Sequence, residues 1–404
     1  MKLGVLTTSY PRWLGDDAGI FVERLVEKLA PHYQEVTVIV PADGTEPSLE
    51  QRGAVTISRY RYGICARGQL AFGLGIAPNI RARPALILQI PGLLCGMLWR
   101  AGRRLQTADV ILANWLFAGV VAGLLFWARR TPYVVVLRGG DIKFLRVFPW
   151  LSGRILKNAR RVVTVSAALR EEAIAAIPEL ARSTEVINNG ITYTPPPRED
   201  LLRFLTERGL RKGRYLLFCG SIIPRKRIAV LFDILAAGAL IDYDLVLCGR
   251  IGEAGYHAEL VERARILGVT DRVRFAGLVD PREISSYLAG AAAYLSAAEF
   301  EGRPNGVLEA MLARVVCVLS DIPAHRELVR DNVSGILDAL DDSAAVARRL
   351  GELLSDRVRY QQMVDVAHAH VAESSWEGCA ERYRATLSAA SIAAAPNETG
   401  KPPR

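Results

Sequence analysis

The sequence predicts an α/β protein with two doubly wound domains that face each other across a cleft. The chain has 404 residues, of which 50% are hydrophobic, and this is more than one compact core normally uses. Short apolar runs alternate with helix-length amphipathic segments along its length, which is typical of parallel sheets covered by helices. Three consecutive prolines, Pro195–Pro197, interrupt this alternation and mark the boundary between the domains.

The first domain is predicted for residues 1–192. Its strands are Lys2–Thr8, Glu35–Val40, Val110–Ala113, Tyr133–Leu137 and Val162–Val165. Several are apolar throughout, which indicates a parallel sheet buried on both faces. Residues 19–29 carry apolar side chains at helical spacing, and Asp16, Asp17 and Gly19 before them are turn-forming and capping residues.

The second domain, predicted for residues 198–372, repeats the alternation. Its strands are Tyr215–Cys219, Leu245–Cys248, Val273–Phe275, Ala293–Ser296 and Val315–Leu319. In such a Rossmann-like domain the ligand binds beyond the carboxyl ends of the strands. A last helix near residues 375–388 is expected to pack on the first domain, and the tail 389–404 has no apolar stripe and is predicted to be disordered.

The net charge of +9 is concentrated in the first half of the chain. Residues up to Pro195 include 24 Lys and Arg against 14 Asp and Glu, whereas the remainder has 27 against 28. A basic surface attracts an anionic membrane, a phosphorylated ligand or a nucleic acid. Since the sequence has neither paired zinc ligands nor aromatic-studded strand signatures, we expect no nucleic acid partner. A lipid or phosphate partner is favoured, and a solvated basic surface without a partner is the alternative.

Two apolar stretches are candidates for membrane contact. Neither Pro84–Trp99 nor Trp115–Ala128 reaches the roughly 18 to 20 residues that cross a bilayer. The second lies between two predicted strands, so we expect a crossover helix that covers the sheet. Arginines at positions 81, 83, 100, 103 and 104 flank the first, as they would flank a segment resting on an anionic leaflet. A core or inter-domain helix is the alternative.

The cysteines, the histidines and the first residues indicate a reducing compartment. The six cysteines are scattered without metal-ligand spacing and are expected to be buried thiols, and the five histidines form no cluster. The chain begins with a short apolar strand instead of a cleavable signal. We therefore expect no metal site and a cytoplasmic protein, either free or peripheral on the inner face of the membrane.

The segment Glu299–Met311 carries the clearest chemical signal. Seven residues separate Glu301, in a loop after a predicted strand, from Glu309. Pro304 suits the first turn of a helix, so backbone N–H groups of residues 302–307 are expected at a helix N-terminus, where a diphosphate binds. Glu309 then lies about one turn further in, where a carboxylate can accept hydrogen bonds from a ribose. The alternative is that both glutamates are ordinary surface residues.

This segment resembles the Glu, seven residues, Glu motif of the retaining glycosyltransferases of family 4 (glycosyl transferases group 1), which have the GT-B fold. The likeness covers roughly Lys2 to Leu387 and indicates the fold and the family but not the sugar. Other matching stretches occur in the same order and at similar spacing: Thr164–Ser166, Val186–Ile191, Val273–Gly277, Ala291–Ser296, and Ser320–Pro323 with Glu327.

The resemblance implies a role for each matching residue. Glu301 would bind hydroxyls of the donor sugar, Gly306 and Val307 would offer backbone N–H groups to the phosphates, and Glu309 would bind the ribose. Lys226 would neutralise the leaving diphosphate. The implied catalytic residues are Glu301, Lys226, Arg138 and Asp141, and the implied donor-binding residues are Gly19, Ser221, Arg225, Lys226, Arg250, Leu278, Glu301, Arg303, Gly306, Val307, Leu308 and Glu309.

Two positions depart from the family pattern. Ser221 stands where the family often has Arg, and Arg225 is the candidate to replace that cation. Arg138 stands where the family commonly has His; its permanently charged guanidinium can bind a phosphate or an acidic acceptor group but cannot accept a proton. Asp141 is the other polar group there, and a structural ion pair between Arg138 and Asp141 is the alternative.

The resemblance implies a metal-independent, cofactor-free enzyme that moves a sugar from a UDP- or GDP-sugar to a glycan or lipid-linked acceptor, with retention, in cell-envelope, exopolysaccharide or glycolipid biosynthesis. Gly19 matches a family loop glycine at which the donor approaches the backbone, although a helix start alone explains it. The alternatives are a nucleotide-sugar epimerase or a phosphorylase of the same fold, a catalytically silent nucleotide-sugar-binding subunit, and a membrane-surface scaffold.

Overall fold

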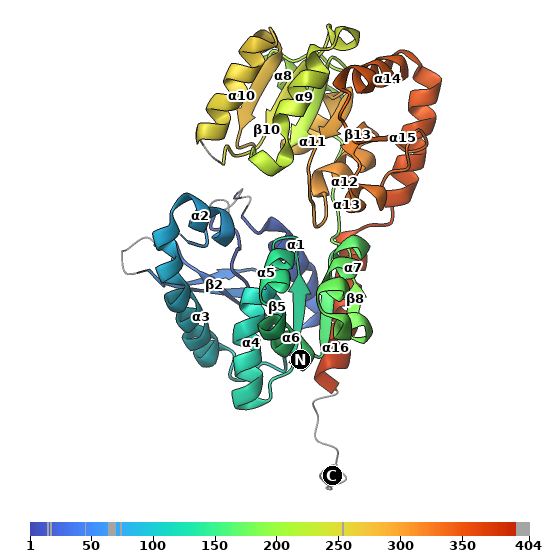
Figure 1. Ribbon diagram of the computed structural model, residues 1–404. Helices are drawn as coiled ribbons and strands as arrows, with labels where there is room; N and C mark the ends of the chain where they lie inside the picture. The colour runs from blue at the N-terminus through green and yellow to red at the C-terminus, as the bar shows by residue number, and fades with distance from the viewer. Residues whose placement is uncertain are drawn as a thin grey trace. The chain divides into compact units, whose positions relative to one another are not determined.

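The computed structural model describes residues 1–13, 16, 18–44, 46–63, 70–72, 75–252 and 254–392. The chain forms two compact domains (Figure 1). The N-terminal domain comprises residues 1–190 and the final helix from Trp376, and the C-terminal domain comprises Ile191–Ser375. The domain boundary thus lies a few residues before Pro195–Pro197, and the helix predicted near residues 375–388 belongs to the N-terminal domain.

Within the described residues, the N-terminal domain has an eight-stranded sheet in the order β3-β4-β2-β1-β5-β6-β7-β8. All neighbouring strands are parallel except β3 and β4, which are antiparallel. The expectation of a wholly parallel sheet is wrong at this edge because Gly53, with φ +57°, permits a tight turn between the two strands. The strands are β1 (Lys2–Leu6), β2 (Glu35–Pro41), β3 (Leu49–Arg52), β4 (Val55–Tyr60), β5 (Val110–Asn114), β6 (Tyr133–Leu137), β7 (Arg161–Thr164) and β8 (Thr184–Val186).

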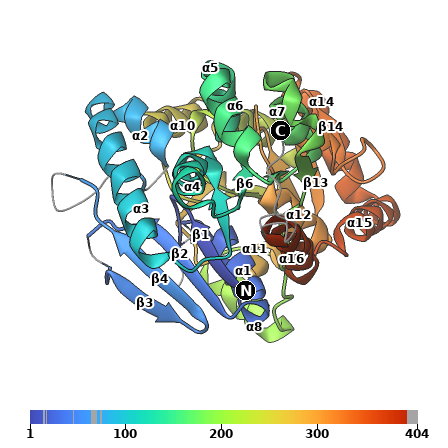
Figure 2. The same cartoon turned by 90° about the horizontal axis from the view of Figure 1, so that it is seen from below.

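Helices cover both faces of this sheet. The α-helices are α1 (Ile20–Leu29), α2 (Ile76–Ala82), α3 (Ile90–Arg104), α4 (Trp115–Arg129), α5 (Asp141–Val147), α6 (Pro149–Asn158), α7 (Ala167–Ala176) and α16 (Trp376–Ile392), and the 3₁₀ helices are η1 (Ala30–His32), η2 (Pro84–Gln89) and η3 (Pro178–Arg182). Figure 2 shows α3, α4 and α6 on one side and α1 with α16 on the other. Helix α4 packs on β5 and β6, which confirms the predicted crossover helix.

The C-terminal domain has a second sheet, which is parallel throughout its described strands. Its order is β11-β10-β9-β12-β13-β14. The strands are β9 (Tyr215–Cys219), β10 (Asp244–Cys248), β11 (Val273–Gly277), β12 (Ala293–Ser296), β13 (Val316–Ser320) and β14 (Ile336–Asp338). The helices are α8 (Arg198–Glu207), η4 (Pro224–Lys226), α9 (Ile228–Ala236), η5 (Gly238–Leu240), α10 (Ala254–Ile266), η6 (Thr270–Arg272), α11 (Ile284–Gly290), α12 (Asn305–Leu312), α13 (Pro323–Arg326), α14 (Ser343–Ser355) and α15 (Arg357–Val371).

The alternation of side chains along the strands builds two apolar cores in this domain. In β9, Leu216 and Phe218 join one core, which includes Phe232, whereas Tyr215 and Leu217 join the other. This is the period of two of an extended strand. Because both faces are apolar, polar groups are left to gather where the strands end.

Several smaller predictions are corrected by the structure. Helix α16 continues through Ile392, so the prediction of disorder is wrong for residues 389–392, and residues 393–404 of the predicted tail lie outside the described residues. Cys95 is exposed instead of buried, because it lies on the outer side of α3. Cys65 and Asp17 also lie outside the described residues. Within the part of the chain that the structure describes, no group of His, Cys, Asp and Glu could hold a metal ion.

Candidate functional site

Three glycines lie where three neighbouring strands of the C-terminal sheet end. Gly220, Gly249 and Gly277 have φ values of +151°, +150° and +69°. The Gly249 N–H donates to the Gly277 carbonyl (2.7 Å), and the Gly220 N–H donates to the Cys248 carbonyl (2.8 Å). A Cβ on Gly249 would lie 1.9 Å from the Gly220 carbonyl oxygen, so only glycine allows this approach. Sequence reasoning missed this row, although its signal, a glycine at the end of three apolar strands, is visible.

The loop after β9 brings two cations against one carboxylate. The Lys226 ammonium contacts the Glu301 carboxylate, and Nη1 of Arg225 lies 3.7 Å from the same carboxylate. The backbone holds the two loops together, because the Glu299 N–H donates to the Arg225 carbonyl (3.0 Å) and Arg225 Nη1 donates to the Phe300 carbonyl (2.8 Å). Neighbouring side chains diverge on a regular helix, but the short turn of η4 directs both toward Glu301.

Burial changes the electrostatics of this cluster. It lowers the pKa of Lys226 to about 7, and the positive charge of Arg225 is the second cause. The Glu301 carboxylate acts in the opposite direction, because it stabilises the ammonium form. Burial also lowers the pKa of Arg225, which nevertheless stays charged at neutral pH. Lys226 is thus a partly desolvated group whose charge an incoming anion would stabilise.

Helix α12 begins directly after the Glu301 loop. A Cβ on Gly306 would lie 2.3 Å from the Tyr294 hydroxyl, which donates to the Cys219 carbonyl (3.0 Å). The glycine therefore lets the start of α12 approach the end of β9. The Val307 N–H donates to the Pro304 carbonyl (3.1 Å). This bond closes the first turn of the helix, and phosphate binding by the Val307 amide stays a prediction.

The other predicted donor-binding residues of this domain fall into two groups. Glu309 lies within α12, and its charge adds to the effect of burial in raising the pKa of Tyr294. Leu308 is fully buried and its N–H donates to the Pro304 carbonyl (3.2 Å). The Leu308 side chain packs in the core, and donor binding by this residue stays a prediction.

The loops after β9 and β10 hold two further predicted residues. Ser221 follows Gly220, and Arg250 follows Gly249. The Ile222 N–H donates to the Arg250 carbonyl (2.9 Å), which joins the two loops. Arg303 precedes α12 in the same loop as Glu301. All these positions therefore belong to loops at the carboxyl edge of the sheet.

His325 is a buried residue near this cluster that sequence reasoning missed. It is 0% exposed, and its Nδ1 lies 2.7 Å from the Ser320 carbonyl, to which a protonated Nδ1 donates. Burial lowers its pKa to about 4, and the charge of Lys226 contributes to this shift. The ring is therefore neutral at physiological pH. A single histidine without a spaced partner gives no signal in a sequence, which explains the omission.

In the N-terminal domain, Arg138 is part of an internal network. It is 6% exposed and follows β6. Its Nη2 donates to Asn114 Oδ1 (3.0 Å), its Nη1 donates to Asn189 Oδ1 (3.3 Å), and the guanidinium lies 4.2 Å from the centre of the Phe21 ring. Among the described residues, the guanidinium bonds to amides and not to the Asp141 carboxylate. The alternative of a structural Arg138–Asp141 ion pair is therefore wrong.

Asp141 forms hydrogen bonds at the starts of helices α4 and α5. Its carboxylate accepts the Arg138 backbone N–H (2.7 Å) and the Leu116 N–H (3.0 Å), at the ends of β6 and β5. Burial raises its pKa to about 6, although both backbone donors oppose that shift. Both oxygens are therefore engaged in positioning backbone, which gives Asp141 a structural task whatever else it does.

A local packing reason accounts for Gly19. It has φ +69°, and a Cβ would lie 2.4 Å from the Ser9 carbonyl oxygen. The Val22 N–H donates to the Gly19 carbonyl (2.8 Å) in the first turn of α1. The close approach to the chain after β1 requires glycine here, and donor binding by Gly19 stays a prediction.

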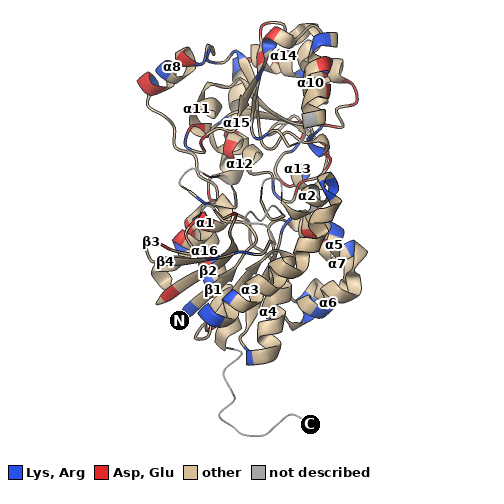
Figure 3. Cartoon of the chain, turned by 90° about the vertical axis from the view of Figure 1, so that its left-hand side faces the viewer, with Lys and Arg blue, Asp and Glu red and all other residues tan. Residues whose placement is uncertain are grey.

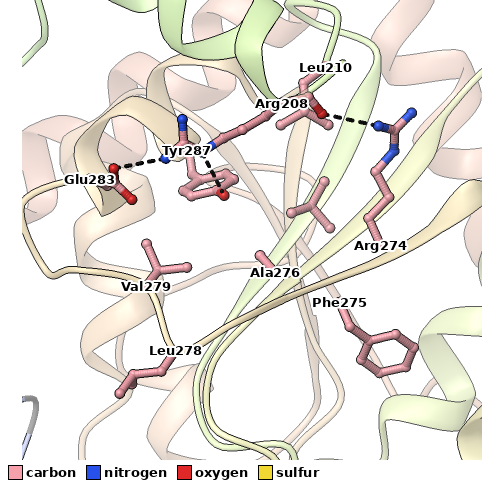
Figure 4. Close-up of a pocket in the computed structure, with 10 residues that line it drawn as sticks. Arg208, Leu210, Arg274, Phe275, Ala276, Leu278, Val279, Glu283 and Tyr287 are labelled. Carbon is pink, nitrogen blue, oxygen red and sulfur yellow. Dashed lines mark hydrogen bonds and ion pairs between the residues drawn. The ribbon is translucent and has the colours of Figure 1, made fainter.

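Leu278, predicted to contact the donor base, lies on a separate cavity of about 340 Å³ beside β11 (Figure 4). The arginines of this cavity already have anionic partners: Arg208 lies 2.8 Å from Glu283, and Arg274 lies 2.9 Å from Asp244. The residues around the cavity do not include Lys226 or Glu301; they are Arg208, Leu210, Val246, Arg274, Phe275, Ala276, Leu278, Val279, Glu283 and Tyr287. Leu278 directly follows Gly277 of the glycine row, and donor binding by Leu278 stays a prediction.

The fold and this cluster define a class of protein. The chain has two Rossmann-like domains, which is the GT-B fold of the glycosyltransferases. The C-terminal domain carries Lys226, Arg225 and the start of α12 at the carboxyl edge of its sheet. The chain matches the model of Glycosyltransferase Family 4 over residues 18–194 and that of Glycosyl transferases group 1 over residues 213–356. The chain belongs to the family 4 glycosyltransferases.

Individual proteins show the same likeness. A D-inositol 3-phosphate glycosyltransferase of Salinispora tropica is 32% identical over 41% of this chain and 36% of its own length. A phosphatidyl-myo-inositol mannosyltransferase of Mycobacterium leprae is 33% identical over 41% of this chain and 44% of its own. The matched region thus spans less than half of either relative. The crystal structure of Anabaena Alr3699/HepE in complex with UDP-glucose superimposes with a TM-score of 0.75 at 21% identity, covering 96% and 100% of the two chains.

Proposed function

We propose that this protein is a retaining glycosyltransferase that moves a sugar from a UDP- or GDP-sugar to a glycan or lipid-linked acceptor, in cell-envelope, exopolysaccharide or glycolipid biosynthesis at the inner face of the membrane. One observation carries this proposal: Lys226 and Arg225 converge on Glu301 beside the start of α12. Cations next to a helix N-terminus suit a diphosphate, and a carboxylate beside them suits sugar hydroxyls.

The names of the similar proteins support the donor and acceptor classes. One similar structure contains UDP-glucose, and two relatives are named for inositol-containing acceptors. The basic N-terminal half fits a phosphorylated or membrane-bound acceptor.

The mechanism that we propose needs no metal ion and no cofactor. Breaking the bond between the anomeric carbon and the phosphate oxygen leaves positive charge on the sugar ring and negative charge on the diphosphate. Lys226 and Arg225 would stabilise the leaving diphosphate by preorganised electrostatics. The acceptor hydroxyl attacks the anomeric carbon on the face that the diphosphate leaves, and its proton passes to a phosphate oxygen. Glu301 would release Lys226 to the phosphate and bind sugar hydroxyls.

A donor panel and an acceptor assay test the proposal. In a thermal-shift screen, the correct nucleotide sugar should raise the melting temperature of the wild type, and Glu309→Ala should reduce that shift by removing the ribose contact. Nucleotide should then be released at an appreciable rate only when an acceptor is present. Donor isomerisation without acceptor would indicate an epimerase, and donor binding without turnover on phosphoinositide, polyprenol-linked and free glycan acceptors would indicate a silent subunit; either result contradicts the proposal.

A further inference from the structure

One side of the N-terminal domain has an unusual distribution of charge. Between Arg81 and Arg161 the sequence contains 14 Lys and Arg but two acidic residues, Asp109 and Asp141. Asp141 is buried, and Asp109 accepts a hydrogen bond from the Lys2 backbone N–H (2.6 Å). The outward-facing charge of this stretch is therefore almost wholly positive. Blue segments mark α6 and the lower ends of α3 and α4 in Figure 3.

The same stretch exposes large apolar side chains. Trp127 is 81% exposed, Trp150 77%, Leu88 76% and Trp99 58%. The others of this kind between residues 81 and 161 are Ile87, Leu124, Phe144, Val147, Phe148 and Leu151. Single exposed apolar residues are normal on a surface, whereas a group that includes three tryptophans marks an interaction site.

These residues belong to one layer of helices. Helix α3 packs against α4, α4 against α6, and α6 against α5, and α3, α4 and α6 lie on one side of the sheet in Figure 2. The segment Pro84–Arg104 is long and apolar enough to cross a membrane, with a mean hydropathy of 1.3 and 17% of that window buried. However, Leu93, Met97 and Ala101 of α3 are fully buried against the domain. This segment therefore belongs to the fold and presents its other side outward.

We propose that the outer side of α3, α4 and the α5–α6 corner docks onto an anionic lipid bilayer. Tryptophan suits the interface between acyl chains and headgroups, where its ring is apolar and its N–H stays hydrated. Arginines beside the tryptophans, such as Arg103, whose guanidinium lies 5.2 Å from the centre of the Trp99 ring, meet the phosphates of anionic headgroups. The two signals reinforce each other as in other interfacial anchors. The positive charge favours an anionic bilayer over a second copy of this protein as the binding partner, because two copies of this face would repel each other.

Vesicle binding of the full chain tests this docking without any donor or acceptor, so its outcome is independent of the transferase assignment. The wild type should sediment with vesicles of phosphatidylcholine containing 30% phosphatidylglycerol and much less with pure phosphatidylcholine. The charge variant Arg103→Gln, Arg104→Gln and Lys143→Gln should bind on the order of 100-fold more weakly, since each basic residue near the surface contributes about five-fold. Its matched control, Arg211→Gln, Lys212→Gln and Arg348→Gln in the C-terminal domain, removes the same charge and should bind as the wild type does.

The apolar contribution needs its own variant. Trp99→Ser, Trp127→Ser and Trp150→Ser should abolish sedimentation with both vesicle types, whereas Ile241→Ser, Ile266→Ser and Val358→Ser, which alter residues 69%, 63% and 68% exposed in the C-terminal domain, should change nothing. Thermal unfolding of each variant shows whether it is folded, and equal losses in test and control variants would overturn the proposal. Sedimentation velocity without vesicles gives a second test. The proposal would be overturned if the wild type were a dimer, the tryptophan variant were a monomer, and the wild type did not bind vesicles.

Discussion

The two domains use the carboxyl ends of their strands in different ways. In the N-terminal domain, Arg138 and Asp141 follow β6 and bind groups of the same domain, namely side-chain amides and backbone N–H groups. In the C-terminal domain, Lys226 and Arg225 follow β9 and share the carboxylate of Glu301. The Glu301 carboxylate faces two cations, whereas two nitrogens of the Arg138 guanidinium donate to side-chain amides and its buried Nε has no hydrogen-bond partner among the described residues. The same position in the same fold thus holds an internal network in one domain and the proposed donor-binding cluster in the other.

Of the changes that test this difference between the two domains, Lys226→Ala should have the largest effect, which is a loss of turnover. Removing one preorganised contact to the leaving diphosphate should lower turnover on the order of 100-fold to 1000-fold. The change should lower stability only slightly, because burial disfavours the charge of Lys226 in the free protein and Arg225 still lies beside the Glu301 carboxylate. Steady-state kinetics with the donor found by the thermal-shift screen measure the loss. Arg227→Ala, at the next position, is the matched control and should retain most of the activity; equal losses in both would place the effect in loop folding.

Replacing Arg138 should show the opposite behaviour. Arg138→Met leaves the side-chain oxygens of Asn114 and Asn189 without their donor, at about 1–3 kcal/mol for each buried unsatisfied group. We expect the free energy of unfolding of the N-terminal domain to fall by about 3 kcal/mol. All six tryptophans belong to that domain, so tryptophan fluorescence during urea denaturation reports its unfolding specifically.

Binding measurements decide between the two roles for Arg138. Donor affinity should change less than about two-fold in Arg138→Met. The proposed donor-binding contacts belong to the C-terminal domain, and Arg138→Met removes none of them. Arg154→Met, an exposed arginine on α6, is the control for stability and should have little effect. A fully stable Arg138→Met protein with a hundred-fold loss of turnover would return Arg138 to the ligand-binding role that the sequence suggested.

The spacing of apolar residues and the composition of each segment allowed much of the fold to be predicted. Apolar runs such as Tyr215–Cys219 and Ala293–Ser296 match the observed strands residue for residue, because a strand buried on both faces has no other composition. Strands β3, β4 and β14 were missed: the polar residues Glu50 and Gln51 dilute the signal of the edge strand β3, and β14 has three residues. Pro304, expected in the first turn of a helix, is the N-cap residue of α12, which begins at Asn305.

The candidate site was predictable in its residue types but not in its contacts. The segment around Glu301 and the cation Lys226 were found from spacing and resemblance. The two meet where the Glu299 N–H donates to the Arg225 carbonyl, which is a contact between residues far apart in the sequence. Likewise, a sequence shows that Arg138 is charged but not that Asn114 and Asn189 lie within its reach. Long-range partners decide which charges are free to bind a ligand.

The smallest effect, and the one that probes the comparison most finely, is the pH dependence of donor binding. Burial lowers the pKa of Lys226 from 10.5 to about 7, so the ammonium form predominates below pH 7, is half present at pH 7 and is lost as the pH rises further. A diphosphate binds the ammonium form, and donor affinity should therefore fall above pH 7 by up to about ten-fold per pH unit, until the pKa of the complex is reached. The neighbouring groups do not titrate here, because the pKa of His325 is about 4 and Arg225 stays charged.

Lys226→Arg separates this titration from other causes. Arginine keeps its charge throughout, so calorimetric titrations between pH 6 and 9 should give a nearly constant donor affinity for this variant, even if that affinity is lower because the guanidinium fits the loop differently. A wild-type affinity that stays constant to pH 9 would contradict the prediction. It would mean that the Glu301 carboxylate outweighs burial and keeps the proton on Lys226. In that case the C-terminal cluster would resemble the N-terminal one, with a cation satisfied inside its own domain, and the contrast between the two strand ends would disappear.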